Sequence, residues 1–106
     1  MAPLVLSSAQ RKRLRGLAHE LEPIVQVGRQ GLSDTFVAEV DAALGAHELI
    51  KLRFGAGKER KRELAAELES RLGCACAGIV GHVAVLYRPH PDEAKRRIEL
   101  GQGPSR

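Results

Sequence analysis

The sequence is poor in aromatic residues. Its 106 residues include no tryptophan, one tyrosine and two phenylalanines. Proteins that stack nucleobases on aromatic rings need a better supply, and the patterns described below place Phe36 and Phe54 in the core. The composition therefore argues against base stacking on aromatic side chains. Any binding of nucleic acid should use mainly the phosphate backbone and overall shape.

Cysteine is also scarce. Cys74 and Cys76 are separated by one residue, and two closely spaced cysteines do not make the disulfide framework of a small secreted domain. A structural zinc site with His47 or His82 would need four ligands at suitable spacing, which is not found. We expect reduced thiols packed as small apolar side chains, and no bound metal.

Long apolar segments are missing as well. The opening residues MAPLVLSSAQ have no basic residue ahead of their short apolar run, unlike a secretory signal. No run approaches the length of a membrane-spanning helix. We therefore expect a cytoplasmic protein that does not act in a membrane.

Catalytic motifs are not apparent. No serine or cysteine lies in a known nucleophile motif, and the four histidines are scattered: His19, His47, His82 and His90. The segment GAGK at residues 55–58 is not a nucleotide-binding P-loop, because Leu52 and Glu59 occupy positions that require glycine and Ser or Thr. We expect no enzyme and no cofactor. An enzymatic function would require histidines and carboxylates to converge in one pocket.

Positive charge is in excess. Seventeen Lys and Arg against thirteen Asp and Glu give a formal net charge of +4, which attracts polyanions. The first eighteen residues hold four basic side chains and no acidic one. At 3.6 residues per turn, Arg11, Lys12 and Arg15 fall within about 100° of one another on a helix, away from its leucines.

The first half of the chain predicts two helices and two strands. Ser7 and Gln10 fit a capping box for a helix that ends before Pro23. Residues 24–27 form a strand, Ser33 or Asp34 begins a second helix that Gly45 ends, and residues 48–54 form a second strand. The expected core positions are Leu14, Leu17, Ala18, Leu21, Phe36, Val37, Val40, Leu44, Ile50, Leu52 and Phe54. Lys51 and Arg53 then point to the opposite face of their strand.

The second half predicts a helix and a hairpin. Residues 58–72 form a helix that ends at Gly73, with Glu67 paired to Arg71 and a core stripe of Leu64, Ala65, Leu68 and Leu72. Residues 77–80 and 83–88 form two strands joined by Gly81 and His82. The order α-β-α-β-α-β-β predicts an α/β fold, one compact domain over residues 6–100 with helices packed on a four-stranded mixed sheet. Residues 101–106 are expected to be a disordered tail.

The segment Gly28-Arg29-Gln30-Gly31 joins a predicted strand to a helix N-terminus. Its glycines permit a tight turn and also close approach of another backbone, and a helix N-terminus favours an anion. An ordinary turn and a phosphate site both fit this spacing. The cations Lys51, Arg53, Arg11, Lys12 and Arg15 would strengthen the second interpretation if the fold joined them to the loop, whereas charges on single elements are usually only solvated.

Three segments together resemble one known family: LSSAQRKRLRGLAHELEPIVQVGRQGL, HELIKLRF and GIVGHVAVLYRP, within residues 6–89. They are similar to bacterial YhbY-type proteins, the stand-alone form of the CRM (chloroplast RNA splicing and ribosome maturation) domain. The resemblance implies a fold similar to the C-terminal domain of translation initiation factor three. It also implies RNA binding without catalysis or cofactor, and association of bacterial members with precursors of the large ribosomal subunit.

The same resemblance makes Gly28, Arg29, Gln30 and Gly31 the RNA-contacting loop, by functional analogy with the loop of KH domains. We therefore expect a protein, simplest as a monomer, that binds ribosomal RNA through this loop and the surrounding cations. The alternative is a protein-interaction module that docks its basic face on an acidic ribosomal protein or assembly factor.

Overall fold

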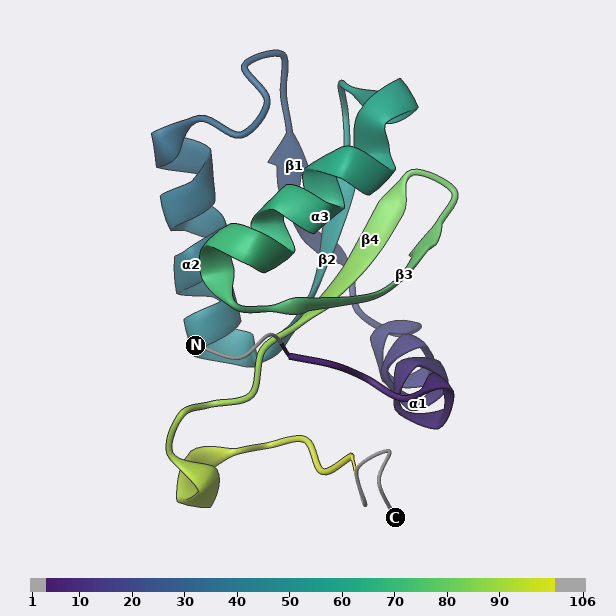
Figure 1. Cartoon of the computed structure of the whole chain (residues 1–106), viewed down its shortest axis with the longest axis vertical. Helices are drawn as coiled ribbons and strands as arrows, with labels where there is room; N and C mark the ends of the chain where they lie inside the picture. Colours follow the sequence, from purple (N-terminus) through teal and green to yellow (C-terminus); the bar gives the residue numbers. More distant parts are fainter. Residues whose placement is uncertain (1–3, 101–106) are drawn as a thin grey trace.

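The computed structural model of the chain describes residues 4–100. Within them the chain forms three α-helices and four strands, in the order α1 (Ser8–Ala18), β1 (Pro23–Val27), α2 (Asp34–His47), β2 (Leu49–Phe54), α3 (Lys61–Leu72), β3 (Ala75–Val80) and β4 (Val83–Tyr87) (Figure 1). Two short 3-10 helices cover Lys58–Arg60 and Glu93–Lys95. The predicted order α-β-α-β-α-β-β is confirmed. The predicted tail at 101–106 lies outside the described residues.

The four strands form one mixed sheet in the order β1-β2-β4-β3. β1 and β2 are parallel, whereas β4 pairs antiparallel with both β2 and β3. The predicted mixed sheet is therefore confirmed, with β1 and β3 at its edges. In the register of the sheet, Gln26 of β1 lies beside Arg53 of β2, and Arg53 lies beside Val83 of β4.

The two faces of the sheet are covered differently. α2 and α3 cover one face and enclose the larger core, whose most deeply buried residues include Val40, Leu52, Phe54, Leu68 and Leu86. On the other face α1 lies mainly against β3 (Figure 1). Here the smaller core consists of Leu6, Leu14, Ala18, Leu49, Ala75, Ala77, Val85 and Tyr87. Because strand side chains alternate, Lys51 and Arg53 point to this second face, which α1 covers only in part.

Helix α1 begins as predicted, with Ser7 and Gln10 in a reciprocal capping box. Its predicted core stripe is wrong in part. Leu14 and Ala18 are buried, but Leu17 and Leu21 are 42% and 39% exposed. The helix ends at Ala18 and rests on the sheet through one line of residues four apart, Gln10, Leu14 and Ala18. Because α1 lies beside an edge strand, no further element within residues 4–100 packs over Leu17 and Leu21.

The predicted end of α2 at Gly45 is wrong. The helix continues to His47, and Glu48 takes the positive φ of +63° at its C-terminus. Glu48 is 3% exposed, and its carboxylate accepts hydrogen bonds from the backbone N–H groups of His90 (2.8 Å) and Arg97 (2.6 Å). Its backbone carbonyl accepts another from the N–H of Arg88. These contacts hold a non-glycine residue in a backbone conformation that usually favours glycine.

The second half of the chain follows its predicted pattern closely. Leu64, Ala65 and Leu68 are buried, and Arg71 pairs with Glu67 at 2.6 Å. The segment 58–72 divides into a 3-10 turn and α3, and β3 begins at Ala75 rather than at residue 77. The earlier start reflects pairing of Ala75 with Tyr87 in β4.

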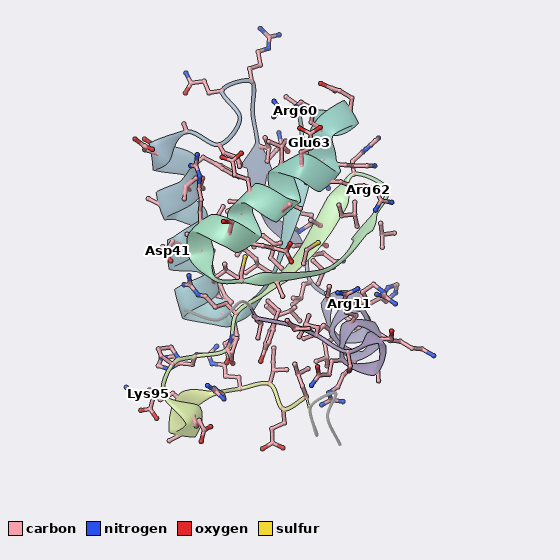
Figure 2. All side chains as sticks on the ribbon, in the orientation of Figure 1. Arg11, Asp41, Arg60, Arg62, Glu63 and Lys95 are labelled. Carbon is pink, nitrogen blue, oxygen red and sulfur yellow. The ribbon has the colours of Figure 1, made fainter. Side chains whose placement is uncertain are left out.

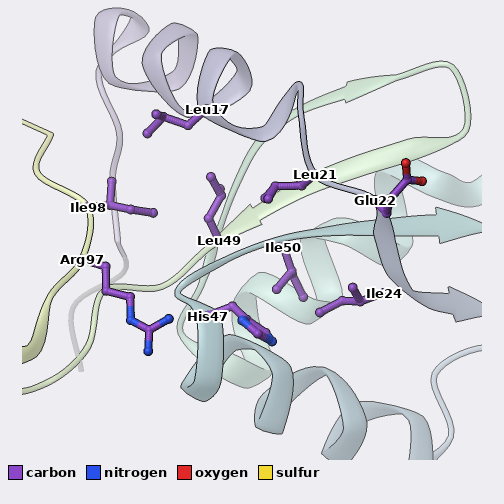
Figure 3. A pocket seen from close by; sticks show the side chains of 9 residues that line it. All are labelled: Leu17, Leu21, Glu22, Ile24, His47, Leu49, Ile50, Arg97 and Ile98. Carbon is purple, nitrogen blue, oxygen red and sulfur yellow. The ribbon is translucent and has the colours of Figure 1, made fainter.

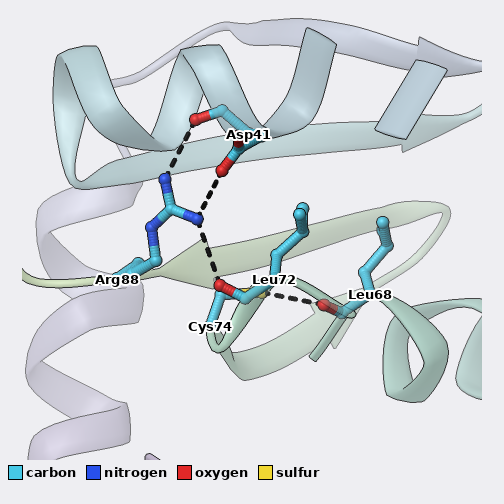
Figure 4. Close-up of polar contacts among 5 residues, drawn as sticks. All are labelled: Asp41, Leu68, Leu72, Cys74 and Arg88. Atoms are coloured by element: carbon cyan, nitrogen blue, oxygen red, sulfur yellow. Dashed lines mark hydrogen bonds and ion pairs between the residues drawn. The ribbon is translucent and has the colours of Figure 1, made fainter. Parts of the chain in front are cut away.

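Arg88 joins the end of β4 to both helices of the larger core (Figure 4). Its guanidinium donates to Oδ1 of Asp41 at 2.7 Å and to the backbone carbonyls of Asp41 and Leu72 at 3.0 and 3.1 Å. Nearby, the thiol of Cys74 donates to the carbonyl of Leu68. Burial raises the pKa of Cys74 from 9.0 to about 11, because the thiolate would lose its hydration.

Candidate functional site

The Gly28–Gly31 loop is a turn with an open outer surface. The N–H of Gly31 donates to the carbonyl of Gly28 at 3.0 Å, and Gly31 has a φ of +65°. A Cβ added at Gly28 or Gly31 would meet no other atom within 4 Å. Arg29 and Gln30 are exposed between the two glycines. The loop is therefore a turn whose backbone another molecule can approach closely.

Two neighbouring segments support this loop from the inner side. The N–H groups of Gly55 and Ala56 both donate to the carbonyl of Val27 at 3.0 Å, which ties the end of β2 to the end of β1. Ser33 caps α2 by accepting from the N–H of Phe36 at 3.2 Å. This cap leaves the first-turn N–H groups of Asp34 and Thr35 near the loop, although the carboxylate of Asp34 reduces the positive potential there.

A cationic hollow of about 380 Å³ lies on the partly covered face of the sheet. Its cations are Arg15 of α1 and Lys51 and Arg53 of β2, and Glu22 contributes one carboxylate. Arg15 donates to the carbonyl of Ala77 at 2.9 Å, and Lys51 donates to that of His19 at 3.4 Å. These bonds to backbone carbonyls orient both cations without neutralising their charge.

A second basic site lies at the β3 edge. Arg11 of α1 and Arg62 of α3 lie on opposite sides of this strand and line one shallow groove (Figure 2). The carboxylate of Glu69 is also in the groove, where it accepts a hydrogen bond from the N–H of Cys76 at 2.8 Å. This edge groove is less suited to an anion than the cationic hollow, because Glu69 shares it.

The structure thus separates the predicted site residues into groups. Arg15, Lys51 and Arg53 come together in the cationic hollow, Arg11 lines the edge groove, and Lys12 lines neither. The Gly28–Gly31 loop lies at one end of the molecule, away from α1 (Figure 1). Arg53 links the two regions, because it lies beside Gln26, two residues before Gly28.

The cations of these groups are not neutralised within the fold. The ion pairs among residues 4–100 are Arg60–Glu63, Arg71–Glu67, Arg88–Asp41 and Arg96–Glu93. None of the predicted site cations takes part in them: Arg11, Lys12, Arg15, Arg29, Lys51 and Arg53. Their combined field is therefore available to an external anion.

Sequence reasoning missed the basic residues at the start of α3. Lys58, Lys61 and Arg62 follow the loop that bonds to Val27, and the first turn of α3 lies at the same end of the molecule as the Gly28–Gly31 loop (Figure 1). Lys61 donates to the carbonyl of Gly81 in the β3–β4 turn. The run KERKR was a visible signal, but its place at this end of the molecule depends on the parallel pairing of β1 and β2.

A further hollow, of about 440 Å³, is mainly apolar (Figure 3). Its walls include Leu17, Leu21 and Ile24, and it is bordered by His47, Glu22 and Arg97. This is where the two leucines that were wrongly placed in the core are found.

The described residues provide neither a metal centre nor a membrane-spanning helix. No group of three or more His, Cys, Asp or Glu side chains within residues 4–100 is arranged to hold a metal ion. None of the helices in that part of the chain has both the length and the apolar character to cross a membrane.

Comparison with known proteins agrees with this architecture. Residues 6–88 match the model of the CRS1/YhbY (CRM) domain. An RNA-binding protein of Haemophilus influenzae is 42% identical over 94 residues, which cover 88% of this chain and 94% of that protein. A probable RNA-binding protein of Pseudomonas aeruginosa is 31% identical over 100 residues, covering 93% and 96% of the two chains.

A solved structure shows the same fold. The solution structure of a Staphylococcus aureus protein, described as a candidate RNA-binding protein, superimposes with a TM-score of 0.74 at 28% identity. The match covers 90% of this chain and all of the staphylococcal one. On the strength of the domain match and of the two close relatives, this chain belongs to the CRS1/YhbY (CRM) domain family.

Proposed function

We propose that this protein binds structured RNA by contacting the phosphate backbone of the RNA. The contacts are made by the Gly28–Gly31 loop and by the cations on the sheet face that α1 covers only in part. The single observation that carries the proposal is the set of site cations without an ion pair within residues 4–100, of which Arg53 lies beside Gln26, two residues before a loop with open space over both glycines. Relatives that are 42% and 31% identical carry names that describe RNA-binding proteins, which supports the same class of ligand.

Each part of the surface has a distinct physical role in this proposal. The bare backbone at Gly28 lets a phosphate or ribose approach without meeting a side chain, and Arg29 provides a charge beside it. Arg53 continues the positive tract from the loop toward Arg15 and Lys51. Neutralising several phosphates releases counterions, so the affinity should fall steeply as salt is added.

The proposed target is ribosomal RNA or a precursor of the large ribosomal subunit during assembly, in the cytoplasm. The resemblance noted from the sequence supplies this part of the proposal. Binding requires no chemical step and no cofactor, and a monomer is sufficient because the loop and the hollow belong to one chain.

The test is a titration of labelled fragments of large-subunit ribosomal RNA at two salt concentrations. Gly28→Asp should lower the affinity at least about tenfold, because a carboxylate would stand where phosphate approaches. Gly28→Ala should have a smaller effect. Gly28 is the better position for this test, since its φ lies outside the positive range that makes a substitution at Gly31 strained.

A matched control separates local from general charge effects. Ala42→Asp adds the same charge to an exposed position on α2, away from the loop and the hollow. It should change the affinity much less than Gly28→Asp. Equal affinities for these two variants would make the loop an ordinary turn, and absence of RNA binding by the folded wild type would favour docking of the basic face on an acidic protein.

A further inference from the structure

The cationic hollow combines three kinds of group on adjacent elements. Arg15, Lys51 and Arg53 supply positive charge, Val80, Val83 and Val85 supply apolar surface, and Glu22 supplies a hydrogen-bond acceptor. The valines belong to the β3–β4 hairpin, whereas the cations belong to α1 and β2. A simple phosphate site would need only the first kind of group.

Binding of the RNA phosphate backbone does not explain why Val80 is exposed. This side chain is 66% exposed at the rim of the hollow, and Val83 beside it is only partly buried. The two residues pair across the hairpin, so their side chains lie on the same face as Arg53, which pairs with Val83. Apolar surface next to unpaired cations fits a ligand with a flat, weakly polar part and a charged part.

A nucleotide outside a helix has these two parts. Its base offers an apolar face with hydrogen-bond donors at the edge, and its phosphate offers a negative charge. Phe36, Phe54 and Tyr87 are all buried, so aromatic stacking is not provided among these residues, but guanidinium planes such as that of Arg53 also stack on bases. A volume of about 380 Å³ lies within the range of small-ligand sites, roughly 300 to 1,000 Å³.

A regular duplex does not offer these groups to the hollow. Its bases are stacked inside the helix, and its outer surface presents phosphates and ribose hydroxyls. A duplex bound over this face would leave the valines against charged backbone. A bulged, looped or terminal nucleotide would place its base over them and keep its phosphate near Lys51 and Arg15.

We propose that the hollow between α1 and the β2–β4–β3 side of the sheet binds one unpaired nucleotide of RNA. The base lies against Val80 and Val83, the guanidinium of Arg53 packs on it, and Arg15 and Lys51 hold the flanking phosphate. Glu22 accepts a hydrogen bond from a donor on the base edge. This inference rests on the proposed RNA binding and specifies which feature of the RNA is recognised.

The test compares two RNA hairpins that differ only in one extra, unpaired adenosine in the stem. Stacking of a base on an aromatic ring is worth a factor of roughly five to a hundred in affinity, and we expect the guanidinium of Arg53 to give the lower part of that range. The wild type should therefore bind the bulged hairpin about tenfold more tightly than the fully paired one. Equal affinities would overturn the nucleotide site and leave RNA binding intact, whereas failure to bind either hairpin would overturn the proposed function itself.

Two valines of nearly equal exposure provide the matched variants. Val80→Asp places a charge at the rim of the hollow, while Val5→Asp places the same charge at a 65% exposed position that does not line it. Val80→Asp should abolish the preference for the bulged hairpin, and Val5→Asp should retain it. If Val80→Asp keeps the preference, or if Val5→Asp loses it equally, the hollow is not the site.

A measurement on the unaltered protein guards against loss of folding in these variants. Methyl signals can be followed by NMR while a short single-stranded RNA is added. The signals of Val80, Val83 and Val85 should shift, and that of Val5 should not. Unchanged signals for all three hollow valines at saturating RNA would overturn the assignment.

Discussion

Glu48 is predicted to determine how firmly residues 89–98 are held to the domain. Its side chain accepts hydrogen bonds from the N–H groups of His90 and Arg97, and the segment that follows brings Ile98 and Leu100 against the smaller core. Two substitutions separate the contributions of the side chain and of the backbone. Glu48→Ala removes the carboxylate and keeps the positive φ, whereas Glu48→Gly removes the carboxylate and also relieves the backbone.

The magnitudes follow from the contacts. Hydrogen bonds to a charged group contribute about 1.5 to 3 kcal/mol each, and part of this is regained when the freed N–H groups reach water. We expect Glu48→Ala to lower the free energy of unfolding by about 3 kcal/mol. Glu48→Gly should lower it by about 1 to 2 kcal/mol less, because glycine adopts a φ of +63° without steric cost.

The order of these two variants is the distinctive result. In a helix interior alanine is more stable than glycine by roughly 1 kcal/mol, and at Glu48 we expect the reverse. Urea denaturation followed by circular dichroism measures both values. Amide hydrogen exchange should show that the N–H groups of His90 and Arg97 lose protection in both variants.

The control is Glu39→Ala, which removes an exposed carboxylate from the same helix. It should change the free energy of unfolding by less than about 0.5 kcal/mol. The reasoning is refuted if Glu48→Ala is as stable as Glu39→Ala, or if the alanine variant at Glu48 is more stable than the glycine variant.

Two further predictions concern the larger core. Arg88→Ala should lower the free energy of unfolding by roughly 1 to 3 kcal/mol, because its contacts to Asp41 and Leu72 are lost. Arg88→Lys should lower it by less than Arg88→Ala but should not reach the wild-type value, because one ammonium cannot reproduce the planar contacts of the guanidinium. Urea denaturation tests both variants. Burial raises the pKa of Cys74 to about 11, so the folded thiol keeps its proton where the unfolded thiol, with a pKa near 9.0, loses it. As the pH rises from below 9.0 to about 11, the free energy of unfolding of the wild type should therefore fall by about 2 to 3 kcal/mol more than that of Cys74→Ala. Equal decreases for the two proteins in urea titrations would contradict this.

Much of the fold was predictable because its rules are local. Alternation placed Leu52 and Phe54 in the core and Lys51 and Arg53 on the other face, and the capping box at Ser7 located the start of α1. Each of these inferences depends on neighbours within one strand or one helical turn. The helix end at Gly73 and the hairpin turn at Gly81 were predictable for the same reason, and these glycines have φ values of +64° and +60°.

The failures all required knowledge of distant residues. Glu48 ends α2 because contacts from residues 88–97, some forty residues away, offset its backbone conformation, and no local pattern contains that information. Leu17 has the spacing of a core residue, but α1 lies at a sheet edge that covers only one line of its side chains. Helical periodicity predicts which residues share a face, whereas exposure depends on what lies opposite that face.

The same distinction applies to the candidate site. The sequence identified the Gly28–Gly31 loop and the cations of α1 and β2, since composition and spacing reveal charge. It did not show that Lys51 and Arg53 share a hollow with Arg15 and three valines, because that grouping results from packing α1 beside the hairpin. Positive charge alone indicates attraction to a polyanion. The fold also brings apolar surface beside this charge, and for that reason we expect recognition of an unpaired base. That expectation depends above all on Val80, an apolar side chain that is exposed.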